Sequence, residues 1–201
     1  EGYNAGSLGL ASAFSFYPGK NLGNIADGGA IVSSSKELVE IVRALANYGA
    51  KEKYVHDLIG TNSRLPEISA HFLRKKLSTY DRDLKTRREQ ARYYMTKLDL
   101  TFTRNIRRVN IEHSALHLFT IQVENNLRAC DFLKSKNIET LIHYPHTILH
   151  YLKKFDIKFE LLRNYSNGME LENFSDLSIP IGMHLSKVEL NEIIDTINTQ
   201  L

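Results

Sequence analysis

The segment Phe14-Ser-Phe-Tyr-Pro-Gly-Lys-Asn-Leu-Gly23 joins a strand-like pattern to a glycine-bounded loop that contains one lysine. Residues 11–17 alternate small or polar residues with aromatic ones, which predicts a strand. Lys20 follows between Gly19 and Gly23, where the backbone can approach a ligand closely. A lysine amine forms Schiff bases when burial or a neighbouring cation lowers its pKa. The segment therefore suits a Schiff-base lysine, although a strand, a turn and a solvated lysine would give the same pattern.

Regular elements are predicted after this segment. Residues 30–32 indicate a second strand, and Ser34-x-x-Glu37 is a capping-box pattern that predicts a helix as far as Leu45. Residues 47–63 lack an apolar period and contain two glycines, which predicts a long loop of the kind that often carries function. A single long helix is expected over residues 66–98, because a proline suits the first helical position and apolar residues recur along it.

The second half of the chain alternates predicted strands and helices. Strands are expected at residues 116–123, 140–143 and 177–181, with a helix at 127–133. The last helix has a capping box, Ser186-x-x-Glu189, and one apolar face formed by Leu190, Ile193, Ile194, Ile197 and Leu201. This alternation predicts an α/β or α+β architecture, with a domain boundary along the long helix.

Composition limits the class of protein. The chain has 201 residues with 42% apolar content, enough for a substantial core, and a net charge of +3, which does not favour nucleic acid as a partner. Neither a membrane-spanning run nor a secretory signal pattern is visible. The single Cys130 fits a reducing cytoplasm and is expected to be a small buried hydrophobe. Because the chain begins at Glu1 rather than Met, a fragment or a processed product is expected.

Two clusters of basic or histidine side chains are further candidate binding sites. Three histidines, His143, His146 and His150, lie close together, but their spacing matches no metal-binding pattern and no cysteine is near, so no metal site is expected. Three arginines, Arg104, Arg107 and Arg108, are typical of a solvated loop rather than of a nucleic-acid interface.

Four blocks in order, at 6–32, 47–70, 141–145 and 179–186, resemble the DegT/DnrJ/StrS family of sugar aminotransferases. The resemblance implies an α/β fold: the carboxy-terminal half of a fold-type-I, aspartate aminotransferase-like enzyme that uses pyridoxal phosphate (PLP). Residues 1–90 would finish the large cofactor domain and start the long helix. Residues 91–201 would form a small α+β domain.

The resemblance also implies roles for individual residues. Lys20 matches the lysine that holds PLP and moves the proton during transamination, and family relatives that act as dehydratases have histidine there. Ser15 matches a ligand of the cofactor phosphate, consistent with its hydroxyl. Asn62 matches an asparagine that reaches the phosphate in the neighbouring subunit, which implies a homodimer with shared active sites.

The block Leu141-Ile-His-Tyr-Pro145 is similar to the subgroup that aminates the 3-keto position of dTDP-linked 6-deoxyhexoses. In that subgroup the residues matching Tyr17, His143 and Tyr144 surround the sugar, and such rings supply stacking surface and hydrogen bonds to hydroxyls. The implied reaction transfers an amino group from an amino acid, expected to be glutamate, to a nucleotide-linked keto sugar in deoxyamino-sugar and glycan biosynthesis. Alternatively, His143 and Tyr144 simply close a strand.

The sequence departs from the family pattern in three respects. Leu10 and Ala26 replace a usual Asp and Gly, which is tolerable. The family's first half is absent, and with it the Gly-Thr pair at the phosphate, the ring that stacks on the pyridine and the aspartate that protonates it. The isolated chain is therefore expected to bind PLP weakly and not to transaminate. The alternative function is a truncated, non-catalytic fragment that binds sugar, dimerises or regulates.

Overall fold

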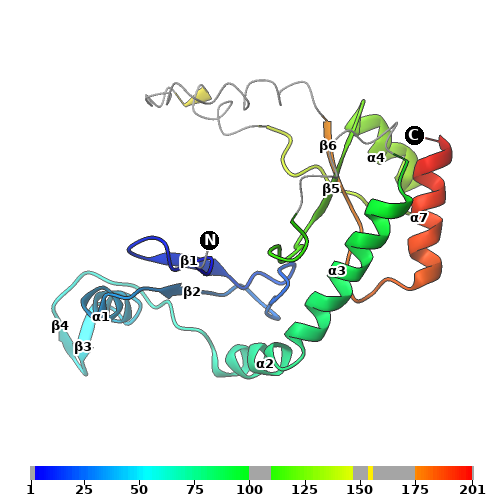
Figure 1. Ribbon diagram of the computed structural model, residues 1–201. Coiled ribbons are helices and arrows are strands. Elements are labelled where there is room, and N and C mark those ends of the chain that lie inside the picture. Colours follow the sequence, from blue (N-terminus) through cyan, green and yellow to red (C-terminus); the bar gives the residue numbers. More distant parts are fainter. Residues whose placement is uncertain (1–2, 100–109, 147–153, 156–174, 201) are drawn as a thin grey trace. The chain divides into compact units, whose positions relative to one another are not determined.

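The computed structural model describes residues 3–99, 110–146, 154–155 and 175–200 (Figure 1). The chain divides into two compact units, Glu1–Asp81 (unit 1) and Arg82–Leu201 (unit 2). Both contain helices and strands, which confirms the predicted mixed α/β class. The arginines of the basic cluster and His150 lie outside the described residues. None of the described helices has the length and apolar character needed to cross a membrane.

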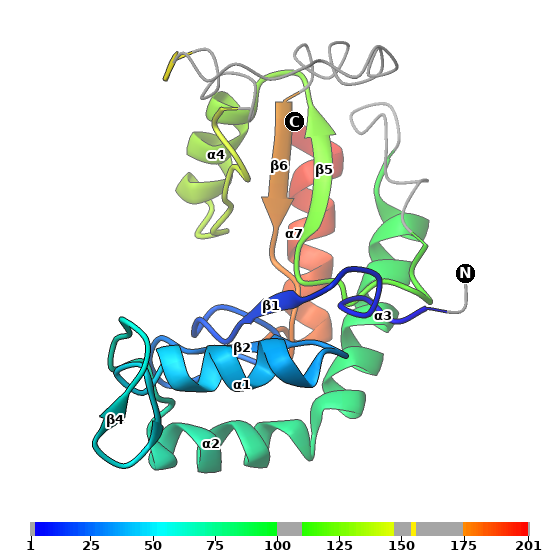
Figure 2. The same ribbon diagram turned by 90° about the vertical axis from the view of Figure 1, so that its left-hand side faces the viewer.

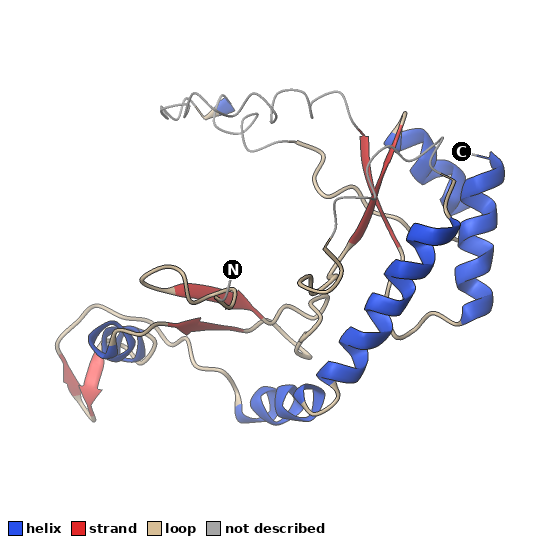
Figure 3. Ribbon diagram, in the orientation of Figure 1, coloured by secondary structure: helices blue, strands red, loops and turns tan. Residues whose placement is uncertain are grey.

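Unit 1 begins with an antiparallel pair, β1 (Ser12–Ser15) and β2 (Gly29–Val32), in which Ser12 faces Val32 and Ser15 faces Gly29. The predicted strands are thus confirmed. The segment between them, residues 16–28, contains no helix or strand (Figure 3). This long connection is the loop that holds Lys20.

Helix α1 (Lys36–Leu45) is capped one residue later than the sequence predicted. The N-cap is Ser35, whose Oγ accepts a hydrogen bond from the backbone N of Leu38 at 3.2 Å. The prediction of a capping box on Ser34 is therefore wrong. With Ser35 as N-cap the third helical position is Leu38, which cannot return a hydrogen bond as glutamate does in a capping box.

Residues 47–63, predicted as loop, contain a short irregular hairpin of β3 (Ala50–Glu52) and β4 (Val55–His56). The chain leaves α1 through Gly49 at φ +76°, and a Cβ there would lie 1.6 Å from the carbonyl oxygen of Leu58, so only glycine fits. After the hairpin the backbone returns to the end of α1. Its amides at 61 and 63 donate to the carbonyls of residues 45 and 46.

The single helix predicted over residues 66–98 is in fact two helices, α2 (Glu67–Leu77) and α3 (Tyr80–Lys97). At the break the hydroxyls of Ser78 and Thr79 donate to the carbonyls of Lys75 and Lys76, at 2.7 and 3.1 Å. Side-chain hydroxyls that satisfy the last carbonyls of a helix let the backbone leave it. The boundary of unit 1 falls just after this break, and the assignment of domains to 1–90 and 91–201 stays a prediction.

Unit 1 has little apolar interior. In its described part the buried apolar side chains are those of Ala44, Ala50 and Leu73. Large apolar side chains on the β1–β2 pair, such as Phe14 and Ile31, are exposed.

Unit 2 is built on a third antiparallel pair, β5 (Phe119–Val123) and β6 (Ser175–Ile179). The strand predicted at 116–123 starts only at Phe119, because Leu116 has φ +47°, outside strand geometry. The strand predicted at 140–143 is reduced to one bridge, between Leu141 and Ser178 on the free side of β6. The predicted helices are confirmed as α4 (Asn126–Ser135) and α7 (Lys187–Gln200).

The hydrophobic core lies in unit 2, where α3 and α7 run beside each other against the β5–β6 pair (Figure 2). Tyr94 of α3 is 0% exposed, its ring lies 5.1 Å from that of Phe119, and its hydroxyl donates to the carbonyl of Pro180 at 2.8 Å. Burial raises the pKa of Tyr94 above its ordinary value, so the phenol stays a hydrogen-bond donor at neutral pH. One buried side chain thus packs against β5 and hydrogen-bonds the chain just beyond β6.

The segment between β6 and α7 is also held by α3. The side-chain amide of Gln90 donates to the carbonyl of Gly182 at 2.9 Å and accepts from its backbone N at 2.8 Å. The capping box predicted for the last helix is confirmed. The backbone N of Ser186 donates to Glu189 at 2.7 Å, and the backbone N of Glu189 donates to the Ser186 hydroxyl at 3.2 Å.

We predict that Ile197→Ala destabilises unit 2 by about 2–5 kcal/mol, because Ile197 is 0% exposed and its truncation leaves a cavity between α7 and the sheet. The matched control is Val188→Ala on the same helix, where the side chain is 65% exposed and the expected change is below about 0.5 kcal/mol. Urea unfolding of both variants measures the difference. Equal losses in the two variants would contradict the proposed core.

The capping box predicts a pH dependence. Hydrogen bonds from the Ser186 hydroxyl and backbone, with a smaller contribution from the charge of His184, lower the pKa of Glu189. A carboxyl with a lowered folded-state pKa stabilises the fold above its unfolded pKa, ordinarily about 4.3, and loses that contribution as the pH falls through the folded value. Wild type and Glu189→Gln should therefore converge in free energy of unfolding as the pH falls below about 4.

Denaturant unfolding over a pH series tests this expectation. In a Ser186→Ala background, where the main hydrogen-bond partner is removed, Glu189→Gln should produce a smaller pH-dependent difference. An unchanged difference in that background would show that the Ser186 cap is not its source.

Candidate cofactor and substrate site

The loop after β1 presents the candidate cofactor lysine. The backbone N of Phe16 donates to the carbonyl of Gly28 at 2.7 Å, and that of Asn24 donates to the carbonyl of Phe16 at 2.8 Å, so the two ends of the loop are tied together. Lys20 closes a turn by donating its backbone N to the carbonyl of Tyr17 at 2.9 Å. Its side chain is half-buried, and its amine makes no hydrogen bond or ion pair within the described residues.

Ser15 ends β1 next to this turn. Its Oγ accepts a hydrogen bond from the backbone N of Tyr17 at 3.2 Å, which leaves the hydroxyl proton available to an outside acceptor such as a phosphate oxygen. The side chains of Ser15 and Tyr17 are exposed. Backbone hydrogen bonds thus hold three of the predicted site residues, Ser15, Tyr17 and Lys20, in one short segment.

Helix α2 supports this loop from a distance in sequence. The amine of Lys76 donates to the carbonyl of Gly23 at 2.9 Å and lies 5.6 Å from the centre of the Phe72 ring. Gly23 itself is sterically required, since a Cβ there would lie 2.1 Å from the carbonyl oxygen of Pro18. No local feature of the sequence indicates the Lys76 contact, which joins residues 53 positions apart.

One buried polar group in the loop lacks a partner. Asn24 is 3% exposed, and within the described residues neither its Nδ2 nor its Oδ1 makes a hydrogen bond. A buried amide without partners is costly and uncommon. A primary amine, a free hydroxyl proton and an unpaired amide together fit a ligand that carries a carbonyl and a phosphate, as PLP does.

Asn62 belongs to a different part of unit 1. It forms a bridge with Asn47 at the end of α1, and its Oδ1 accepts a hydrogen bond from Arg64 Nε at 2.9 Å. In the described part of the chain no hydrogen bond or ion pair joins Asn62 to Ser15 or Lys20. Its expected contact with the cofactor of a neighbouring subunit stays a prediction.

His143 and Tyr144 lie in unit 2. Their rings meet edge to face, with centroids 5.5 Å apart and an interplanar angle of 89°. His143 is half-buried, and its Nδ1 lies 2.9 Å from the hydroxyl oxygen of the buried Ser178, whereas Tyr144 is exposed. Apart from Asn62, the sequence-predicted residues therefore form two groups, one around Lys20 in unit 1 and one around His143 in unit 2.

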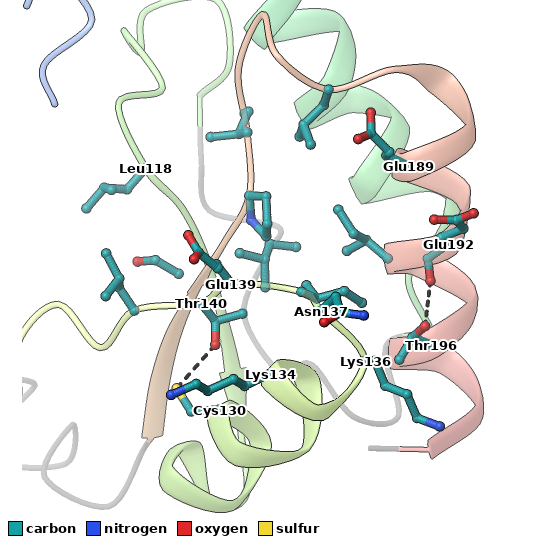
Figure 4. A pocket seen from close by; sticks show the side chains of 18 of the residues that line it. Leu118, Cys130, Lys134, Lys136, Asn137, Glu139, Thr140, Glu189, Glu192 and Thr196 are labelled. Carbon is teal, nitrogen blue, oxygen red and sulfur yellow. Dashed lines mark hydrogen bonds between the residues drawn. The ribbon is translucent and has the colours of Figure 1, made fainter.

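A pocket in unit 2 extends from His143 along β6 to α4 and α7 (Figure 4). Its wall carries both basic and acidic side chains, including Lys134 and Glu139. Cys130, half-buried rather than fully buried as predicted, accepts a hydrogen bond there from Thr140 at 3.3 Å. No group of three or more histidine, cysteine or acidic side chains among the described residues is arranged to hold a metal ion.

The chain is similar to known proteins over nearly its whole length. The chain is 36% identical over 209 residues to the erythromycin biosynthesis sensory transduction protein EryC1 of Saccharopolyspora erythraea, covering 98% of this chain and 54% of that protein. It is 35% identical over 206 residues to the dTDP-3-amino-3,4,6-trideoxy-alpha-D-glucose transaminase of Streptomyces venezuelae, covering 98% of this chain and 52% of that protein. The chain spans about half the length of these relatives.

Solved structures give the same relationship. The crystal structure of S. venezuelae DesV in complex with a ketimine intermediate superposes with a TM-score of 0.80 at 34% identity, covering 98% of this chain and 53% of that chain. An aminotransferase from Brucella abortus gives a TM-score of 0.81 at 28% identity, covering 96% and 51%. These matches confirm the expected fold-type-I relationship. Residues 1–198 match the family model itself, and PLP is the cofactor of that family. The chain belongs to the DegT/DnrJ/EryC1/StrS aminotransferase family.

Proposed function

We propose that this chain provides the cofactor lysine and part of the sugar site of a PLP-dependent aminotransferase that acts on a nucleotide-linked keto sugar. The observation that carries the proposal is the Lys20 segment, in which backbone hydrogen bonds hold a half-buried lysine and a serine whose hydroxyl proton is free within six residues of each other. Membership of an aminotransferase family and the names of the relatives support it.

Lys20, Ser15 and Lys76 have separate roles in this proposal. Lys20 binds the cofactor through its amine and, when released, holds and returns the proton that moves during transamination. Ser15 donates its hydroxyl proton to the cofactor phosphate. Lys76, by binding the carbonyl of Gly23, keeps the loop in place. PLP supplies the electron sink that these residues cannot provide.

The proposed acceptor is a dTDP-linked 3-keto-6-deoxyhexose, with glutamate as amino donor. Similarity to the S. venezuelae transaminase, whose name specifies a 3-amino sugar, supports the 3-keto position. Tyr17, His143 and Tyr144 would contact the sugar through ring faces and hydrogen bonds. The proposed functional unit is a homodimer in which Asn62 serves the partner's cofactor.

Replacing Lys20 tests the cofactor role. The protein is expressed together with any upstream sequence that its gene encodes. Borohydride reduction in the presence of PLP should then leave a stable adduct on the peptide that contains Lys20, which mass spectrometry detects. Lys20→Arg should abolish that adduct and lower kcat roughly 10²- to 10⁴-fold. Lys51→Arg, at an exposed lysine of the same unit, should retain the Lys20 adduct and the wild-type kcat. An adduct located elsewhere would refute the assignment.

Replacing Ser15 tests the phosphate contact. Ser15→Ala should raise the Kd for PLP about 10- to 100-fold, since a hydrogen bond to a charged group contributes about 1.5–3 kcal/mol. Ser12→Ala removes a hydroxyl from the other end of β1 and should leave the Kd unchanged. Absorbance titration with PLP measures both. Equal effects of the two substitutions would mean that Ser15 acts through strand stability rather than through the phosphate.

A second candidate is a non-catalytic module that binds nucleotide sugar. The observation in its favour is the sensory transduction role stated in the name of EryC1. Calorimetric binding of a dTDP-sugar in the absence of PLP, together with no Lys20 adduct, would favour this candidate over the enzyme.

A further inference from the structure

Ser178 is held on both sides by its strand neighbours. Its backbone N donates to the carbonyl of Leu141 at 2.8 Å, and its carbonyl accepts from the backbone N of Leu141 at 3.1 Å. On the other side Ser178 faces Thr120 of β5 in the strand register. Because its own N–H and C=O are used toward Leu141, Ser178 and Thr120 form a non-hydrogen-bonded pair, the type in which side chains lie closest.

This pairing places the Ser178 side chain on the sheet face opposite the core. Its neighbours Leu177 and Ile179 are buried in the core of unit 2, and side chains alternate between the faces of a strand. The Ser178 residue is nevertheless only 6% exposed. A buried hydroxyl needs partners, and it has two: the Thr120 hydroxyl oxygen at 3.3 Å and Nδ1 of His143 at 2.9 Å.

The hydrogen-bond chain from Thr120 through Ser178 to His143 can run in either of two directions. If Thr120 donates to Ser178 and Ser178 donates to Nδ1 of His143, both hydroxyl protons have acceptors. In the reverse direction the proton of the half-buried Thr120 would have to be donated to solvent, so only the forward direction satisfies both hydroxyls within the described residues. The forward direction makes Nδ1 an acceptor, so the neutral imidazole carries its proton on Nε2.

We infer that Ser178 is a positioning residue that fixes the ring of His143 in the Nε2–H tautomer and so makes it a hydrogen-bond donor to an oxygen of the sugar. This inference rests on the proposed function for the sugar contact, but not for the tautomer. Nε2 of His143 makes no hydrogen bond within the described residues, so it is the ring atom available to a ligand. A keto or hydroxyl oxygen accepts such a bond.

The tautomer is measured directly by ¹⁵N NMR of the histidine rings in the PLP-loaded protein, with His143→Gln used to assign the signal. Wild type should show neutral His143 protonated on Nε2. Ser178→Ala should give a mixture of tautomers, and Ser178→Cys, a closer match in size with a weak donor, should do the same. Thr140→Val removes a hydroxyl from the same segment outside the chain of hydrogen bonds and should leave the wild-type spectrum.

Kinetics tests the consequence for the sugar. Loss of one hydrogen bond predicts a roughly 3- to 10-fold rise in KM for the keto sugar in Ser178→Ala, while the half-reaction with glutamate is unchanged. Ser178→Thr, which keeps the hydroxyl, should restore KM. A merely structural role of Ser178 would alter both half-reactions together.

The outcomes separate the two proposals. An unchanged Nε2–H tautomer in both Ser178→Ala and Ser178→Cys, or an equal shift in Thr140→Val, would overturn the positioning role. A shifted tautomer with wild-type KM in His143→Gln would instead refute the proposed sugar contact of His143, leaving the hydrogen-bond chain established.

Discussion

Helix α3 and the β5–β6 pair are packed together through Tyr94, and the order of unit 2 depends on that contact. The ring fills the core beside Phe119, and the hydroxyl, buried with it, must find an acceptor, which is the carbonyl of Pro180. Gln90, one turn earlier, pairs with both backbone groups of Gly182. The same helix therefore positions β5, the end of β6 and the turn that leads to α7.

In unit 1, backbone hydrogen bonds set the position of the Lys20 loop. They tie the two ends of that loop together and return the 47–63 segment to α1. A hydrogen bond to a carbonyl contributes only about 1 kcal/mol net, so several such bonds act together. They hold Lys20 and Ser15 within one short segment.

The two candidate groups complement each other chemically. The Lys20 loop offers an amine and a hydroxyl, which suit a cofactor with a carbonyl and a phosphate. The His143 group offers rings and one oriented N–H, which suit a sugar. Ser178 links the second group to the sheet, so that strand register, a property of the whole unit, determines which nitrogen of a single imidazole carries the proton.

Patterns local in the sequence predicted much of this protein. Alternation predicted the strands around residues 12–15 and 119–123, and the Ser186–Glu189 box predicted the start of α7. These predictions succeeded because each signal lies within a few residues of the feature it specifies. The strand expected at 177–181 lies two residues earlier, at Ser175–Ile179. Local pattern failed at the break between α2 and α3, where an apolar period continues although the hydroxyls of Ser78 and Thr79 end the helix.

The remaining features depend on residues that are distant in the chain. Lys76 reaches Gly23, and Ser178 meets both His143 and Thr120, only after the helices and strands have packed. Nothing near Lys76 or Ser178 in the sequence distinguishes them from other lysines and serines. Sequence alone thus predicted which side chains would carry the chemistry, and folding decided which groups hold them in position, because such contacts require the register and packing of whole elements.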